Sequence, residues 1–216
     1  MKKAYLRRQG FTLIELLVVI TLIGVLAVAV LSALNPIEQI NKGRDAAKRA
    51  DSSQLLNALD RYFASNEKFP WNNFTGYTAS VDVAFGGTAD FAGVGVCGGA
   101  VGSPLATGAG TSGCSSNGYL INTQELKNQY GKRPYFRETS LPADKLQVYK
   151  AINVPSVSVC FIPSSKATRD KAGANGPLKD LTFDGSGNVS GIATCSTVPT
   201  DWSTVDSACF VCIPEE

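Results

Sequence analysis

A largely apolar run near the N-terminus constrains this chain more than any other feature. The run extends over 24 residues, from Phe11 to Leu34, and Glu15 is its only charged residue. As an α-helix rising about 1.5 Å per residue it is about 36 Å long, which is enough to cross a hydrocarbon layer about 30 Å thick. The sequence therefore predicts one membrane-crossing helix ahead of the rest of the fold.

A short basic leader, residues 1–10, precedes this run. It holds four cations and no acid: Lys2, Lys3, Arg7 and Arg8. Because cations are retained on the cytoplasmic side, the N-terminus is expected in the cytoplasm and the chain after Leu34 outside it. Removing the leader leaves 16 basic side chains (20 − 4) against 18 acidic ones, a balance of −2. The slight basicity of the chain is therefore not a nucleic-acid footprint.

Two ordinary interpretations leave Glu15 without a role. One is a secretory signal peptide cleaved near Ala27-Val28-Ala29, but the run is longer than the apolar core of such a peptide. The other is a permanent single-pass anchor, which the length allows. A carboxylate at the centre of a membrane helix costs about 2.5–3.5 kcal/mol, so an acidic residue in the run indicates a function.

The segment Gly10–Leu16 reads Gly-Phe-Thr-Leu-Ile-Glu-Leu and resembles the class III signal of type IV pilins and type II secretion pseudopilins. The resemblance covers the leader and the first helix. It implies that a membrane-bound prepilin peptidase cuts after Gly10 and that Phe11 becomes an N-methylated N-terminus. It also implies an assembly platform and its ATPase as partners, and self-assembly into a helical homopolymer.

Glu15 is the fifth residue of the mature chain that this cut would release. In a filament its carboxylate can meet the Phe11 amine of a neighbouring subunit in apolar surroundings. Such a pair is weak evidence for stability but fixes the register between subunits. The contact is head-to-tail and does not close, which is the kind that builds filaments. Glu15 is thus predicted to be an assembly residue.

The first helix is expected to bend before it leaves the membrane. Many type IV pilins carry a proline at the place that this chain gives to Ser32, whereas here the first proline is Pro36. Gly24 and Pro36 both weaken the helical backbone, so a kink or a melted segment is expected between them. Residues 35–64 then continue as an amphipathic helix with Asn35 as its cap. Its expected apolar stripe is Ile37, Ile40, Ala47, Ala50, Leu55, Leu59, Tyr62 and Phe63.

The remaining chain, residues 65–216, is expected to form a globular head. Eleven of the 21 glycines lie between Gly86 and Gly118, so residues 71–118 are interpreted as a surface loop that buries little apolar area. A short helix is expected at Thr123–Tyr130, ending at Gly131. Alternating patterns predict strands at Leu146–Ile152, Ser156–Ile162, Asp180–Phe183, Asn188–Ala193 and Ala208–Ile213. The patterns therefore predict an α+β fold, a long N-terminal helix packed on an antiparallel sheet within 145–216, and the resemblance implies that this fold is pilin-like.

All six cysteines lie on the exported side of the membrane run: Cys97, Cys114, Cys160, Cys195, Cys209 and Cys212. An even number in an oxidising compartment favours disulfides, although six cysteines allow 15 pairings. A Cys97–Cys114 bond would close part of the glycine-rich segment. Cys195 with either Cys209 or Cys212 would close a C-terminal loop, as in many type IV pilins, and Cys160 would take the one that remains.

Catalytic and metal sites are not indicated. Cys209 and Cys212 form a C-x-x-C, but no helix follows them as in a redox motif, and the chain has no histidine to complete a zinc site. Without histidine the commonest general base is also missing, so neither an enzyme nor a cofactor is expected.

Two further patterns each have a structural and a functional interpretation. Asp184, Ser186 and Asn188 could bind calcium, but they lack the distant bidentate glutamate and suit a hairpin turn better. A basic and aromatic cluster could contact DNA, although a surface or subunit contact is the commoner role of such a cluster. Its members are Tyr130, Lys132, Arg133, Tyr135, Phe136 and Arg137.

The favoured function is a prepilin whose mature form builds an extracellular type IV pilus-like filament. The precursor is expected in the inner (cytoplasmic) membrane and the assembled filament outside the cell or in the periplasm. A type II secretion pseudopilin is the alternative within the same superfamily. The helix exit at Tyr62–Pro70 resembles that of many pseudopilins and bacterial pilins and favours the pseudopilin, whereas the six cysteines and the glycine-rich segment favour the pilin. A minor tip adhesin and a membrane-anchored receptor that never polymerises are alternatives from other classes.

Overall fold

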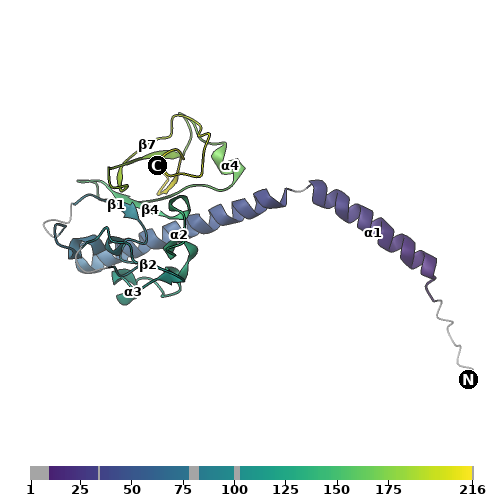
Figure 1. Cartoon of the computed structure of the whole chain (residues 1–216), viewed down its shortest axis with the longest axis horizontal. Helices are drawn as coiled ribbons and strands as arrows, with labels where there is room; N and C mark the ends of the chain where they lie inside the picture. The colour runs from purple at the N-terminus through teal and green to yellow at the C-terminus, as the bar shows by residue number, and fades with distance from the viewer. Residues whose placement is uncertain (1–9, 34, 78–82, 100–102, 216) are drawn as a thin grey trace, which may run out of the picture. The chain divides into compact units, whose positions relative to one another are not determined.

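The computed structural model describes residues 10–33, 35–77, 83–99 and 103–215. The chain divides into two compact units, Met1–Ile40 and Asn41–Glu216. The first unit contains α1 (Leu13–Ala33) and the start of α2 (Pro36–Asn66), which continues into the second unit. The second unit, called the head below, holds the rest of α2 and every strand (Figure 1).

The helix starts and stops are close to those that the sequence predicts. Asn35 caps α2, because its side-chain Oδ1 accepts a hydrogen bond from the Glu38 backbone N–H at 3.2 Å. The helix ends at Asn66, two residues beyond the predicted Ala64. A kink or melted segment is expected between Gly24 and Pro36. The α1 helix continues through Gly24 and ends at Ala33, and α2 begins at Pro36, so the boundary between the two helices lies within the expected range. Leu34, the predicted last residue of the apolar segment, lies outside the described residues.

The head contains a four-stranded antiparallel sheet in the order β1-β4-β5-β8. Its strands are Phe85–Thr88 (β1), Gln147–Lys150 (β4), Ser158–Phe161 (β5) and Val211–Ile213 (β8). Two hairpins complete the strands, β2 (Ala109–Gly110) with β3 (Gly113–Cys114) and β6 (Lys179–Phe183) with β7 (Val189–Thr194). The five strands predicted from the sequence are confirmed, each within a residue or a few of its expected bounds. The α+β fold class, a long helix packed on an antiparallel sheet, is also confirmed.

Short helices connect these elements. Two are α-helical, α3 (Tyr119–Asn122) and α4 (Lys166–Arg169). Five are 3-10 turns: η1 (Pro70–Asn73), η2 (Ala92–Val94), η3 (Tyr130–Lys132), η4 (Pro134–Phe136) and η5 (Pro142–Asp144). The helix predicted at Thr123–Tyr130 is wrong, because α3 ends before it and Gln124 takes a left-handed conformation with φ of 64° that breaks a helix.

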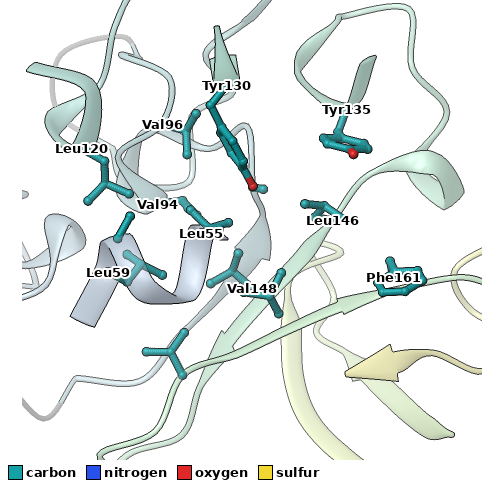
Figure 2. Close-up of a cluster of buried hydrophobic side chains, with 14 of the residues drawn as sticks. Leu55, Leu59, Val94, Val96, Leu120, Tyr130, Tyr135, Leu146, Val148 and Phe161 are labelled. Atoms are coloured by element: carbon teal, nitrogen blue, oxygen red, sulfur yellow. The ribbon is translucent and has the colours of Figure 1, made fainter. Parts of the chain in front are cut away.

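The α2 helix forms the centre of the head core. Leu55 and Leu59 are fully buried, between Val94 and Leu120 on one side and Val148 of the sheet on the other (Figure 2). Burying side chains of this size contributes about 1.5–3 kcal/mol each, so this contact helps to hold the helix and the sheet together.

The predicted apolar stripe of α2 is only partly right. Leu55, Leu59 and Tyr62 are buried, but Ala47, Ala50 and Phe63 are exposed. The buried face is continued toward the N-terminus by polar side chains instead: Asp45, Lys48, Asp51 and Ser52. These are tolerated because each is hydrogen-bonded, for example Asp45 by the backbone and hydroxyl of Ser165 at 3.0 and 2.6 Å.

The interpretation of residues 71–118 as a surface loop is wrong for much of the segment. Trp71, Phe85, Val94 and Val96 are buried in the core, and Phe85–Thr88 is an edge strand of the sheet. The indole ring of Trp71 stacks on the Phe85 ring with centroids 4.7 Å apart. Scattered apolar residues among glycines can fill a core because glycine lets the backbone itself pack closely: a Cβ added at Gly86 would lie 1.7 Å from the Val189 carbonyl oxygen.

Candidate functional site

Three reciprocal hydrogen bonds between Thr12 and Glu15 cap the start of α1. The Glu15 carboxylate Oε2 accepts from the Thr12 backbone N–H at 2.9 Å and from its hydroxyl at 2.8 Å. In return the Glu15 backbone N–H donates to Thr12 Oγ1 at 3.3 Å. This is a capping box, in which a threonine at the N-cap and a glutamate three residues later each satisfy a free backbone N–H. The single acid of the apolar run is therefore held at the helix terminus, where a negative charge is favoured.

Beyond Glu15 the helix presents only apolar or internally satisfied groups. Residues Leu13–Ser32 have a mean hydropathy of 2.9, and none of this segment is buried in the protein. The hydroxyls of Thr21 and Ser32 donate to the carbonyls of Val18 and Ala29, each at 2.9 Å. By length and composition the helix is able to cross a membrane, where such internal bonds spare polar groups the loss of water.

The residues on either side of the predicted cut are open. Gly10 is exposed, and nothing would contact a Cβ placed on it within 4 Å. Phe11 is 83% exposed. A peptidase therefore meets no obstacle from the described residues at the Gly10–Phe11 bond, which lies two residues before the first helical residue, Leu13.

Comparison with protein families locates a known signal in this same region. The family described as "Prokaryotic N-terminal methylation motif" matches residues 5–31. The chain carries the class III prepilin signal of the type IV pilin and pseudopilin superfamily. The prepilin signal covers the end of the leader and most of α1, and the head lies outside the match. No curated protein and no solved structure matches the chain.

This motif indicates a type IV pilin-like protein. Proteins of that kind are generally structural subunits without enzymatic activity. The motif implies processing by a prepilin peptidase. The apolar α1 helix and the signal together are consistent with a precursor in the inner membrane.

Three disulfides cross-link the head, and the structure selects among the open pairings. Cys97 is bonded to Cys114, 17 residues away. Cys195 is bonded to Cys209, and Cys160 to Cys212. The last pair joins directly opposed residues of the neighbouring strands β5 and β8. Cys209 and Cys212 of the C-x-x-C therefore take different partners, so the motif is not a redox pair here.

The Asp184 segment has the geometry of a hairpin turn. The Asp184 N–H donates to the Asn188 carbonyl at 2.9 Å, and its carboxylate accepts from the backbone N–H groups of Ser186 and Asn188. The hydrogen bond from the Asn188 backbone is the largest cause that lowers the pKa of Asp184. Among the residues that the structure describes, no group of three or more His, Cys, Asp or Glu side chains could hold a metal ion.

The basic and aromatic cluster is divided between the core and the surface. Tyr130, Tyr135 and Phe136 are buried, so their rings are not free to stack on nucleic-acid bases. Arg133 is paired with the Asp51 carboxylate at 2.7 Å. Tyr130, Arg133 and Tyr135 therefore hold η3 and η4 against α2, whereas Lys132 and Arg137 of the cluster are exposed.

Sequence reasoning overlooked Thr12. The spacing Thr-x-x-Glu at the start of an apolar run is the usual signature of a capping box, and it was readable in Thr12-Leu13-Ile14-Glu15. The buried carboxylates Asp45 and Asp51 gave no such signal, because their partners Ser164, Ser165 and Arg133 are 82 or more positions away.

Proposed function

We propose that the mature chain begins at an N-methylated Phe11, after cleavage behind Gly10, and is the structural subunit of an extracellular type IV pilus-like filament. Its partners are prepilin peptidase, further copies of the chain, and an assembly platform with its ATPase. Its function is polymerisation, and no catalytic role, cofactor or metal is part of the proposal.

The observation that carries this proposal is α1, an apolar helix that buries nothing inside its own chain. Such a surface needs an apolar environment at all times. The membrane supplies it before assembly, and the α1 helices of neighbouring subunits would supply it in the filament core. The head, with its own hydrophobic core and three disulfides, would then be displayed on the outside.

Glu15 is the proposed register residue of assembly. In the free subunit its carboxylate is satisfied by Thr12, at 2.8 and 2.9 Å. Carboxylates have about four acceptor positions, so the same group can also accept from the Phe11 amine of a neighbouring subunit. The capping box thus keeps the Glu15 carboxylate hydrogen-bonded in the membrane. The carboxylate can still pair with the Phe11 amine of a neighbouring subunit at one spacing between the two subunits.

A type II secretion pseudopilin is the second candidate. It would use α1, Gly10, Phe11 and Glu15 in the same way, in a short periplasmic filament. The helix exit at Tyr62–Pro70 favours it through its sequence resemblance.

The test is electron microscopy of filaments sheared from cells, with mass spectrometry of their content. A major pilin dominates the filaments and carries methyl-Phe11, a tip adhesin is a trace component, and a pseudopilin is absent from the cell surface. An uncut leader at Gly10 would reject the proposal in favour of a membrane-anchored receptor.

The Glu15→Ala variant tests the assembly step separately. Processing should continue, so methyl-Phe11 is found in the membrane, but filament yield should fall because the register contact is lost. Glu138→Ala, which removes an exposed carboxylate on the head, is the control and should assemble normally. A normal filament yield from the Glu15→Ala variant would refute the proposed role of Glu15 in assembly.

A further inference from the structure

A cavity of about 460 Å³ lies in the head between the chain that follows η1 and the α3 helix. Its lining includes three asparagines and two aromatic residues: Asn73, Asn117, Asn122, Phe74 and Tyr119. Its volume falls in the range of about 300–1,000 Å³ that is usual for small-molecule sites.

The lining carries no charge. None of the described residues around the cavity is a lysine, arginine, aspartate or glutamate. Ligands that proteins bind through charge, such as phosphates or carboxylates, therefore have no counter-ion here. Amides and peptide groups make the site too polar for a purely apolar ligand, since burying them without partners is costly.

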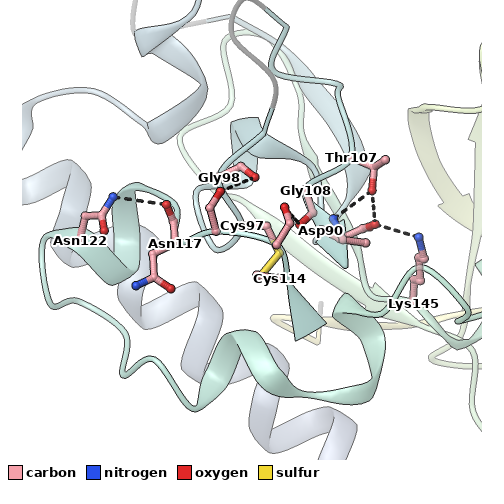
Figure 3. Close-up of a disulfide and its surroundings, with 12 residues drawn as sticks. Asp90, Cys97, Gly98, Thr107, Gly108, Cys114, Asn117, Asn122 and Lys145 are labelled. Carbon is pink, nitrogen blue, oxygen red and sulfur yellow. Dashed lines mark hydrogen bonds and ion pairs between the residues drawn. A yellow bond between two sulfur atoms is a disulfide. The ribbon is translucent and has the colours of Figure 1, made fainter. Parts of the chain in front are cut away.

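The amides supply both donors and acceptors. Asn73 uses its Nδ2 group on the Tyr62 hydroxyl at 3.1 Å and the Pro70 carbonyl at 3.0 Å, which leaves its side-chain oxygen as an acceptor. Asn122 donates through Nδ2 to the Asn117 carbonyl at 3.3 Å (Figure 3). Among the described contacts, no hydrogen bond engages the Asn117 side chain, so it retains two donors and an acceptor. Hydroxyl groups, which both donate and accept, complement such a mixed set.

An aromatic surface lies beside the amides. The Tyr119 ring is 38% exposed and meets the Phe74 ring edge to face, with centroids 6.0 Å apart and an interplanar angle of 88°. Aromatic rings in this position offer a flat apolar face with a polar tip. The combination suits a molecule with one C–H face and a rim of hydroxyls.

The cavity wall is held in place before any ligand binds. The Cys97–Cys114 disulfide fixes one side, and Cys97 pairs with Asn117 through a backbone bridge. Gly118 allows a close backbone approach: its N–H donates to the Val96 carbonyl at 2.8 Å, and a Cβ on it would lie 2.4 Å from the Gly95 oxygen. A pre-formed site loses less ordering entropy on binding, which favours affinity.

We propose that this cavity binds a neutral sugar, a hexose or an N-acetylhexosamine, with its C–H face on Tyr119 and its hydroxyls on the asparagine amides. The site goes beyond the proposed filament function, because it lies in the head and does not use α1. It would give each subunit a contact to a glycosylated surface.

The experiment is saturation-transfer NMR on the full mature chain in lauryldimethylamine oxide, a detergent whose head group contains no sugar. The probes are glucose, galactose, N-acetylglucosamine and N-acetylgalactosamine, with galacturonic acid as the charged comparison. At least one neutral probe should bind with a Kd below about 10 mM, and the acid should bind more weakly than its neutral counterpart. Because unassembled subunits are measured, the result is independent of whether filaments form.

Four variants locate the binding. Tyr119→Ala should weaken it about tenfold while Tyr119→Phe keeps it, because the ring and not the hydroxyl provides the contact. Asn117→Ala should weaken it about fivefold, and its side chain makes no described hydrogen bond whose loss would disturb the fold. Asn128→Ala removes an exposed amide outside the cavity and should change nothing.

Binding of none of the four neutral sugars would overturn the proposal. So would equal binding by the Asn117→Ala and unmodified chains, which would locate the sugar elsewhere. Preference for galacturonic acid over galactose would overturn it as well, since an uncharged lining cannot favour a carboxylate.

Discussion

The Asp51 carboxylate on α2 accepts a hydrogen bond from the Arg133 guanidinium at 2.7 Å, although the two residues are 82 positions apart. The same carboxylate accepts from the Tyr135 hydroxyl, and the Asp51 carbonyl accepts from the Tyr130 hydroxyl at 2.8 Å. Tyr130 and Tyr135 extend from the η3–η4 region toward the core around α2 (Figure 2). One buried acid thus fixes the position of this region on the central helix.

Replacing Asp51 should therefore destabilise the head. Asp51→Ala leaves the buried Tyr135 hydroxyl and the Arg133 charge without their acceptor, and we expect a loss of about 1–3 kcal/mol of unfolding free energy. Thermal unfolding followed by near-UV circular dichroism measures it. Asp60→Ala, an exposed acid on the same helix, is the control and should stay within about 0.5 kcal/mol. Equal midpoints for the two variants would contradict the role of Asp51.

Tyr135 should make the head sensitive to alkali. Burial, followed by its bond to Asp51, raises the pKa of Tyr135 well above the ordinary value. The unfolded chain then releases this proton at about pH 10 while the folded chain retains it. The stabilisation is therefore complete below about pH 10 and declines as the pH rises further.

The comparison with Tyr135→Phe isolates this effect from other groups that titrate in the same range, among them Lys48, whose pKa burial lowers. Unfolding midpoints of both proteins are measured from pH 8 to pH 12. The unmodified chain should lose stability relative to Tyr135→Phe only above about pH 10. A difference that stays constant over the whole range would refute the prediction.

Adding a single methyl group at Gly86 should push the four-stranded sheet away from the β6–β7 hairpin. In Gly86→Ala the new Cβ would overlap the Val189 carbonyl, which is backbone and cannot rotate away. Overpacking of this kind costs about 1–3 kcal/mol. Gly185→Ala, in the open hairpin turn with nothing within 4 Å, is the matched control and should be nearly neutral. Urea unfolding of both variants measures the change in unfolding free energy. If Gly86→Ala does not change it, β1 and β7 do not approach each other so closely.

The Cys97–Cys114 disulfide should stabilise the glycine-rich segment. Replacing both cysteines with serine reopens a loop of 17 residues, and chain entropy predicts a loss of about 3 kcal/mol. The loss should be seen as a lower thermal midpoint under oxidising conditions. Reductant should lower the midpoint of the unmodified chain too. An unchanged midpoint in the double variant would mean that packing around Trp71 and Phe85 holds the segment without the bond.

Local patterns were sufficient wherever a few neighbouring residues set the structure. The apolar run predicted α1, Asn35 and Pro36 predicted the start of α2, and Asp184–Gly187 predicted the turn between β6 and β7. Each depends on hydrogen bonds or periodicity within five residues, which the sequence displays directly. The same reasoning failed for residues 71–118, because their burial depends on α2 and β4, elements outside the segment.

The sequence by itself determined the apolar helix α1 and the signal at its start. Gly10, Phe11 and Glu15 lie within six residues of one signal, and no folded partner is needed to recognise them. Tertiary structure alone decided which cysteines pair, which acids are buried, and that Asn73, Asn117 and Tyr119 surround one cavity. The physical reason is range: a helix and its cap are local, whereas a core, a disulfide and a cavity join residues that only the folded chain brings together.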